Sequence, residues 1–130
     1  MSQIFKFNEL ELPVDMSDAD FVEAYENALD TLGEAEKNLM KTGKTSGIIR
    51  QYCQVFRTFF DDIYGEGTAE KLYGDKYNAR LCEDSYDAFL SCCLKDKEES
   101  ETHRMQIVGK YNGNREQRRA AAKKPYVYKG

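Results

Sequence analysis

The chain has 130 residues, which fits one domain with a core that needs neither disulfides nor metal to stabilise it. Hydrophobic residues make up 41% of the sequence, but no apolar run approaches the roughly 20 residues of a membrane span. The first 15 residues lack the basic flank and apolar block of a signal peptide. We therefore expect a cytoplasmic protein without a membrane partner.

The formal net charge of −4 hides an asymmetry along the chain. Residues 1–102 carry 11 Lys and Arg against 22 Asp and Glu, a net charge of −11. Residues 103–130 carry 8 against 1, a net charge of +7. An acidic body followed by a basic C-terminal segment indicates that the two parts have different roles in association.

Residues 3–14 are predicted to form a β-hairpin. Apolar and polar residues alternate in QIFKF and in LELPV, and Asn8 and Glu9 lie between them as the turn. Pro13 has no backbone donor, which favours an edge position for the second strand. Since a lone hairpin is marginal in water, this one must pack on the helices or pair with the edge of another copy.

The first long helix is predicted to begin after Ser17 or Asp18, since either side chain can act as its N-cap. Its apolar residues recur at steps of three and four, and the opposite face is acidic. Gly43 suits the left-handed residue that ends many helices. The short link that follows favours an antiparallel pair with the next helix.

The central helix is predicted over Ile48–Tyr64, the stretch with the densest apolar content. Nine apolar residues cover more than half of its surface, and Arg57 is assigned with the other polar residues to the solvent side. The sequence Gly65-Glu66-Gly67 ends this helix. Thr68 begins a short helix that Gly74 closes.

A third core helix is predicted to begin at Asp75 or Asn78 and to bury residues between positions 81 and 93. The sequence then loses apolar residues, which indicates a solvated extension that ends before Gly109. The Asn-Gly-Asn sequence at 112–114 marks a firm break.

These elements predict a mainly α fold: a small bundle of three core helices plus a short one, with an N-terminal β-hairpin. Residues 1–111 form this helical domain. Residues 112–130 form a basic C-terminal tail that we expect to be flexible in isolation.

The four cysteines, Cys53, Cys82, Cys92 and Cys93, lie inside helical patterns and are expected to be free thiols, mostly buried. Adjacent residues on a helix point about 100° apart, so only one of Cys92 and Cys93 can face inward. The single histidine, His103, and the lack of any zinc-type spacing argue against a metal site.

No catalytic grouping emerges from the sequence. His103 lies about 15 Å from Cys93 along one helix, too far for a nucleophile and its base. The neighbouring carboxylates Asp61 and Asp62 face different directions and do not form an acid/base pair. We therefore expect no enzyme, no catalytic residues, no cofactor and no metal, and a function exerted by contact with other chains.

Apolar residues around the Gly65–Gly67 break are expected to leave a patch that is partly open in the monomer and can accept a partner helix. These residues are Phe59, Phe60, Ile63, Tyr64, Leu72 and Tyr73. The competing interpretation of the same aromatic side chains is that they simply form the core.

Four segments together resemble a known family: IFKFNELELPVD, DADFVEAYENAL, FFDDIYGEGTAEKLYG and the terminal NREQRRAAAKK. This combination is similar to small proteins of tailed phages and prophages of Gram-positive bacteria described as tail assembly chaperones. The similarity spans nearly the whole chain through positional and compositional motifs.

The resemblance implies a chaperone that binds the tape measure protein, the tail tube protein or both, acts in the host cytoplasm and is not kept in the mature virion. It makes Asn114, Arg115, Gln117, Arg118 and Arg119 a family-like terminal signature. It also implies a possible frameshifted longer form, for which codons of Lys123 and Lys124 would supply the slippery run.

Coating a filament requires self-contact, so we expect a homo-oligomer. The hairpin edge, or the basic tail against a neighbour's acidic helix, would supply the contact, and oligomer size should fall with salt.

Two other classes of function stay open. A phage-encoded inhibitor of a host defence or transcription protein would also be small, acidic, helical and non-catalytic. A small nucleic-acid-binding protein would use the basic residues of the tail together with Tyr126 and Tyr128.

Overall fold

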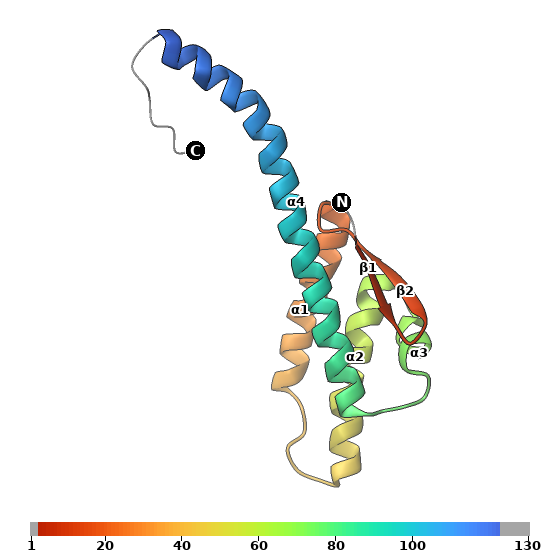
Figure 1. The fold of residues 1–130 in the computed structure, drawn as a ribbon. Helices are drawn as coiled ribbons and strands as arrows, with labels where there is room; N and C mark the ends of the chain where they lie inside the picture. Colours follow the sequence, from red (N-terminus) through yellow and green to blue (C-terminus); the bar gives the residue numbers. More distant parts are fainter. Residues whose placement is uncertain (1–2, 123–130) are drawn as a thin grey trace.

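The computed structural model describes the backbone of residues 3–122 and the side chains of residues 3–111. Two strands precede four helices along the described chain (Figure 1). In order they are β1 (Gln3–Phe7), β2 (Leu10–Val14), α1 (Ala19–Lys37), α2 (Thr45–Tyr64), α3 (Thr68–Tyr73) and α4 (Ala79–Ala122). The expected mainly α fold with an N-terminal hairpin is therefore confirmed.

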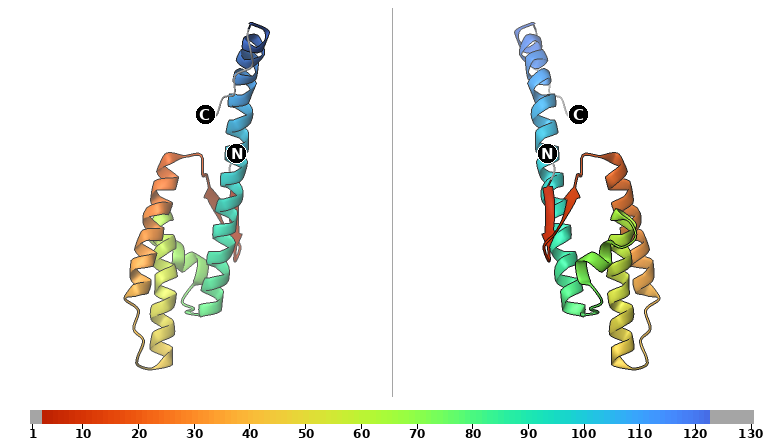
Figure 2. Two further views of the ribbon diagram at one scale, coloured as in Figure 1. Left: turned by 90° about the vertical axis from the view of Figure 1, so that its left-hand side faces the viewer. Right: turned by 90° about the vertical axis from the view of Figure 1, so that its right-hand side faces the viewer.

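The helices α1, α2 and α4 lie side by side, with α2 between the other two, and the hairpin covers α4 and α3 at one edge (Figures 1 and 2). The short link between α1 and α2 makes these helices antiparallel, as expected. The helix α1 ends at Lys37 and not near Gly43: the backbone N–H of Asn38 donates to the carbonyl of Ala35 at 3.1 Å and that of Leu39 to the carbonyl of Glu36 at 3.3 Å, which closes the last turn.

The hairpin pairs β1 with β2 antiparallel, and Phe5 lies opposite Leu12. Asn8 and Glu9 both have positive φ angles, 50° and 65°, which is the geometry of a tight two-residue hairpin turn. The amide of Asn8 donates to the carbonyl of Leu72 at 2.8 Å, so the turn is fixed on α3. The hairpin thus packs on the helices, one of its two expected alternatives.

The core is an aromatic cluster at the point where the hairpin, α2 and α4 meet. Phe89 of α4 is fully buried, and its ring lies 5.3 Å from that of Phe5 and 5.2 Å from that of Phe60. Further ring contacts reach Phe89 from Tyr25 and Phe59. Aromatic pairs in such edge-on arrangements contribute about 0.5–1.5 kcal/mol beyond their buried area.

The helix α4 is one continuous helix through Ala122, which corrects two predictions. Gly109 does not end it, and the Asn-Gly-Asn sequence at 112–114 is not a break in the backbone. Glycine and asparagine cost about 1 kcal/mol or less each in a helix interior, a penalty that the helix on either side can outweigh. The residues 112–122 of the predicted tail are therefore helical, and residues 123–130 lie outside the described part of the chain.

The predicted solvated extension after Leu94 is also wrong over its first two turns. Asp96 is fully buried and Ser100 is 4% exposed, because the link between β2 and α1 passes over them. The backbone N–H of Met16 donates to Asp96 Oδ2 at 2.6 Å, and the hydroxyls of Ser17 and Ser100 are 2.7 Å apart. These contacts join the first helix to the middle of α4.

The cysteines are free thiols, and Cys53, Cys82 and Cys93 are buried whereas Cys92 is half-buried. Of the adjacent pair, Cys93 lies in the core and Cys92 packs partly against it, so the expected contrast between the two is present but incomplete. Burial raises the pKa of Cys82 and that of Cys93 to about 12, so both thiols stay protonated at neutral pH.

Candidate functional site

The predicted open patch at the Gly65–Gly67 break is wrong for most of its residues. Phe59, Phe60, Leu72 and Tyr73 are at most 4% exposed, and Ile63 and Tyr64 are half-buried. The hairpin closes this region, since Phe5 stacks on Phe60 and the Tyr64 hydroxyl donates to the Pro13 carbonyl at 2.6 Å. These side chains belong to the core, which was the competing interpretation of the same pattern.

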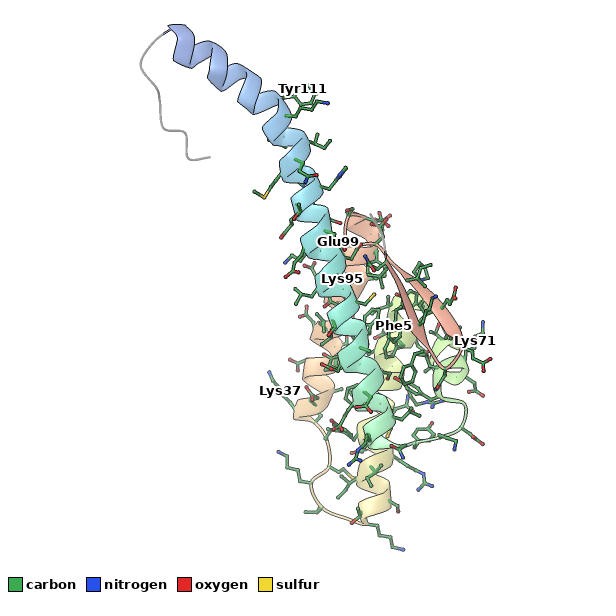
Figure 3. The ribbon with its side chains drawn as sticks, in the orientation of Figure 1. Phe5, Lys37, Lys71, Lys95, Glu99 and Tyr111 are labelled. Atoms are coloured by element: carbon green, nitrogen blue, oxygen red, sulfur yellow. The ribbon has the colours of Figure 1, made fainter. Side chains whose placement is uncertain are left out.

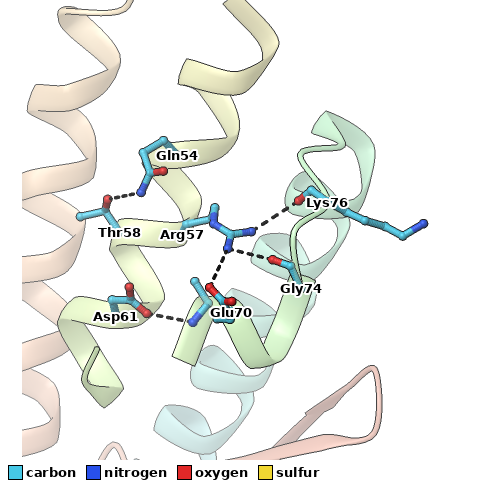
Figure 4. Close-up of polar contacts among 8 residues, drawn as sticks. Gln54, Arg57, Thr58, Asp61, Glu70, Gly74 and Lys76 are labelled. Carbon is cyan, nitrogen blue, oxygen red and sulfur yellow. Dashed lines mark hydrogen bonds and ion pairs between the residues drawn. The ribbon is translucent and has the colours of Figure 1, made fainter. Parts of the chain in front are cut away.

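Arg57 holds the segment after α3 from inside, although the sequence analysis assigned it to the solvent side. Only 6% of Arg57 is exposed, and its guanidinium donates to the carbonyl of Gly74 at 2.9 Å (Figure 4). The same guanidinium lies 4.6 Å from the centre of the Tyr77 ring. One turn later, Asp61 accepts from the backbone N–H of Ala69 at 2.8 Å (Figure 4). The pair Arg57 and Asp61 thus anchors both ends of α3 to α2.

The opposite side of α2 forms a groove with α1, which we name the α1–α2 groove. Its volume is about 270 Å³. The apolar floor consists of Ala28, Leu32, Ala35, Leu39, Val55 and Phe59. The rim consists of Thr31, Asn38, Gln51, Gln54, Thr58 and Asp62. Gln54 and Thr58, which hydrogen-bond each other at 3.2 Å, lie on the side of α2 that faces α1 (Figure 4).

The groove continues towards the beginning of α1 and becomes acidic. A second hollow, of about 500 Å³, shares Ala28, Thr31 and Asp62 with the first. It adds the exposed carboxylates Asp20 and Glu23. We call Asp20, Glu23 and Asp62 the acidic end. The opposite end is mixed in charge: Lys37, Lys41 and Lys44 are exposed there, but Lys37 pairs with the exposed Glu34 at 3.6 Å.

The second unusual surface is the part of α4 that extends beyond the body, residues 101–122, which we name the projecting segment. It stands clear of the other elements in all three views (Figures 1 and 2). Its exposed large apolar side chains are Met105, Ile107, Val108 and Tyr111, and Tyr111 points into solvent (Figure 3). Their exposed fractions run from 48% to 72%. Exposed apolar residues grouped on one short stretch make this segment a candidate contact surface.

The signature residues Asn114, Arg115, Gln117, Arg118 and Arg119 follow in the same helix. Their side chains lie outside the described ones. By helical spacing, position 115 is one turn beyond Tyr111 and position 118 two turns beyond it. The basic positions therefore continue the face that carries Ile107 and Tyr111.

The titratable side chains of the body whose pKa is clearly shifted are buried phenols and thiols. Burial raises the pKa of Tyr25 to about 12 and raises those of Tyr64 and Tyr73, so these phenols stay protonated. His103 is exposed, as expected. Among residues 3–122, no group of three His, Cys, Asp or Glu side chains is placed to bind a metal ion, and no helix has the length and apolarity needed to cross a membrane.

Within the described residues, fold and surfaces define a helical domain with an apolar groove between α1 and α2 and a helix end on which no other described element packs. Residues 8–122 match a family of unknown function, DUF6673, and the chain belongs to this family. The match covers β2, all four helices and the projecting segment. Comparison with curated proteins and with solved structures gives no match.

Proposed function

We propose that the protein is a non-enzymatic assembly chaperone that binds an amphipathic helix of a long helical client. The resemblance to tail assembly chaperones suggests the client, the tape measure protein of a tailed phage. The observation that carries the proposal is the α1–α2 groove, with its apolar floor, polar rim and open face to solvent.

The composition of the groove suits a helix better than a small molecule. Ala28 and Ala35 keep the floor low on the α1 side, which lets a helix backbone approach closely. The uncharged side chains Thr31, Gln51 and Gln54 can hydrogen-bond to the polar flank of such a helix. Along α1, positions 20 to 37 span about 26 Å, which is long enough for some five helical turns.

The charge of the body supports transient binding. The acidic end would attract a client segment whose basic residues follow its apolar ones, and such steering mainly raises the association rate. A client that must later be released needs this kind of contact more than a large, fully apolar interface.

The test is co-expression with a tape measure protein of a tailed phage, followed by affinity capture. Ala35→Trp fills the groove floor and should lower client binding at least tenfold. The matched control is Ala88→Trp, an exposed alanine on α4 away from the groove, which should bind like the wild type. Circular dichroism checks that both variants fold.

Equal capture by the two tryptophan variants would show that the groove is not the binding surface. Absence of any tape measure protein in the wild-type capture would remove the proposed client.

A further inference from the structure

We infer that the projecting segment of one copy docks in the α1–α2 groove of a second copy, so that copies join head to tail. This contact uses the groove proposed above for the client and in that respect rests on the proposed function. Self-association and client binding would then exclude each other. The occupant is identified by three features of the described residues: the continuation of a helical stripe, the order of apolar and charged residues, and reach.

The inward stripe of α4 continues past the body, and no other element between residues 3 and 122 packs on it there. Its buried members within the body are Cys82, Ser85, Phe89, Cys93, Asp96 and Ser100, at steps of three and four. The same steps lead to His103, Ile107 and Tyr111, and all three are exposed. Residues that recur at helical spacing lie on one face of a helix, and in the body this face packs on the other elements. Among the described residues, this copy supplies no surface that covers the next members of the stripe.

The order of residue types on the projecting segment matches the order in the groove. The segment is apolar at Ile107, Val108 and Tyr111 and then basic at positions 115, 118 and 119. The groove is apolar around Leu32 and Ala35 and then acidic at Asp20, Glu23 and Asp62. Opposite charges on the two surfaces favour this pair, and like charges in the reverse pairing would cost several kcal/mol.

The spacing along the two helices agrees with this match. Val108 to position 118 is ten residues, or about 15 Å, and Leu32 to Glu23 is nine residues, or about 14 Å. The other end of the groove offers less attraction to the basic positions, because Lys41 and Lys44 are exposed there and Glu34 is already paired with Lys37 at 3.6 Å. The docked segment must therefore run antiparallel to α1, with its arginines at Asp20 and Glu23.

A copy cannot fill its own groove while α4 stays helical. Position 115 lies about 22 Å along the axis from Ser100, where the last buried side chain of α4 contacts the start of α1. The Debye length at physiological salt is only about 8 Å, so charges at that separation are largely screened. A second copy supplies the acidic end at contact distance, which the copy's own fold does not.

The experiment uses two complementary charge reversals in the full chain. The helix variant is R115E/R118E/R119E, and the groove variant is D20K/E23K/D62K. Analytical ultracentrifugation of the wild type should show oligomers at about 50 mM salt and smaller species at 500 mM. Each variant alone should raise the concentration needed for association at least about 100-fold, because each places like charges against each other.

Mixing the two variants should restore association, since each helix then meets a groove of opposite charge. The matched control is E66K/D84K/D87K, which reverses three exposed carboxylates outside the groove and should associate like the wild type. Circular dichroism confirms that each variant folds.

Three outcomes would overturn the inference: a wild type that is monomeric at both salt concentrations, a groove variant that associates like the control, or a mixture that does not recover. A monomeric wild type that still captures the tape measure protein would leave the proposed function standing. Oligomers that follow the charge-reversal pattern, without capture of the client, would support the head-to-tail contact and remove the proposed client.

Discussion

Residues 79–100 and residues 101–122 form one helix, α4, but the first part packs on the body and the second extends beyond it. The first part buries a side chain at nearly every turn, with Phe89 at its centre. The second part has no buried side chain among those described, although its apolar residues continue the same spacing. The comparison shows that helical spacing predicts which face of α4 can be buried. Whether that face is covered depends on the neighbouring elements, which end near Ser100.

The boundary between the two parts is set by the hairpin and by the link to α1. Gln3 donates to Glu99 at 2.6 Å, and Ser17 contacts Ser100. Beyond this level no other helix or strand of residues 3–122 lies on α4 (Figure 1). Whatever covers Ile107 and Tyr111 must therefore come from outside the described part of the chain.

The largest difference between the two parts should appear on truncation of an aromatic side chain. Phe89→Ala should lower the free energy of unfolding by about 3–5 kcal/mol, because the cavity would open among five aromatic rings. Tyr111→Ala should change it by no more than about 0.5 kcal/mol in dilute monomer, since the ring is 64% exposed. Urea unfolding followed by circular dichroism measures both.

A loss above about 1 kcal/mol for Tyr111→Ala at concentrations where the protein is monomeric would mean that the ring packs on its own body. The comparison between the two parts of α4 would then be wrong.

The same comparison explains what the sequence predicted well. The hairpin, its turn and the inward residues of α2 follow from alternation and helical spacing, and these patterns are local. The start of α4 also follows: the side chain of Asn78 accepts from the backbone N–H of Leu81 at 3.0 Å, a typical N-terminal cap. Local patterns therefore sufficed for the elements.

The errors arose where distant segments meet. Arg57 and Asp96 look like surface residues in sequence, but each satisfies backbone groups of a loop that folds over it. The open apolar patch was wrong because the hairpin, more than 40 residues away in sequence, covers Phe60. The α1–α2 groove was missed for the same reason, since no single stretch of sequence contains both of its walls. The acidic face of α1 was its only sequence signal.

Alkaline pH should destabilise the body of the protein in a defined range. Burial is the main cause that raises the pKa values of Cys82 and Cys93 from 9.0 to about 12, and that of Tyr25 from 10.0 to about 12. These groups ionise more easily in the unfolded chain, so the folded state holds more protons above pH 9. The stability they contribute is complete below about pH 9 and should fall steadily between about pH 9 and 12.

Urea unfolding at a series of pH values measures this slope. Cys93→Ala removes one of the three groups and should make the fall shallower, whatever it does to the stability at pH 7. A stability that stays flat up to pH 12, or a slope unchanged in Cys93→Ala, would contradict the assignment of buried protonated thiols.

The smallest effect concerns the projecting segment itself. Gly109 lies inside α4, and a methyl group added at its Cα would meet no atom within 4 Å. Gly109→Ala should therefore stabilise the helix locally by about 0.5–1 kcal/mol, the difference in helix propensity between the two residues. Because this segment makes few contacts with the body, global unfolding by urea should hardly change, whereas amide hydrogen exchange around residues 105–113 should slow about two- to fivefold.

The matched control is Gly33→Ala, which adds the same methyl group to α1, within the body, again with no atom in reach. The helix α1 unfolds together with the core. The stabilisation by Gly33→Ala should therefore appear in the global free energy of unfolding. If Gly109→Ala instead raised global stability as much as Gly33→Ala, the projecting segment would fold together with the body. Its exposed stripe would then not be a surface that is independent of the body.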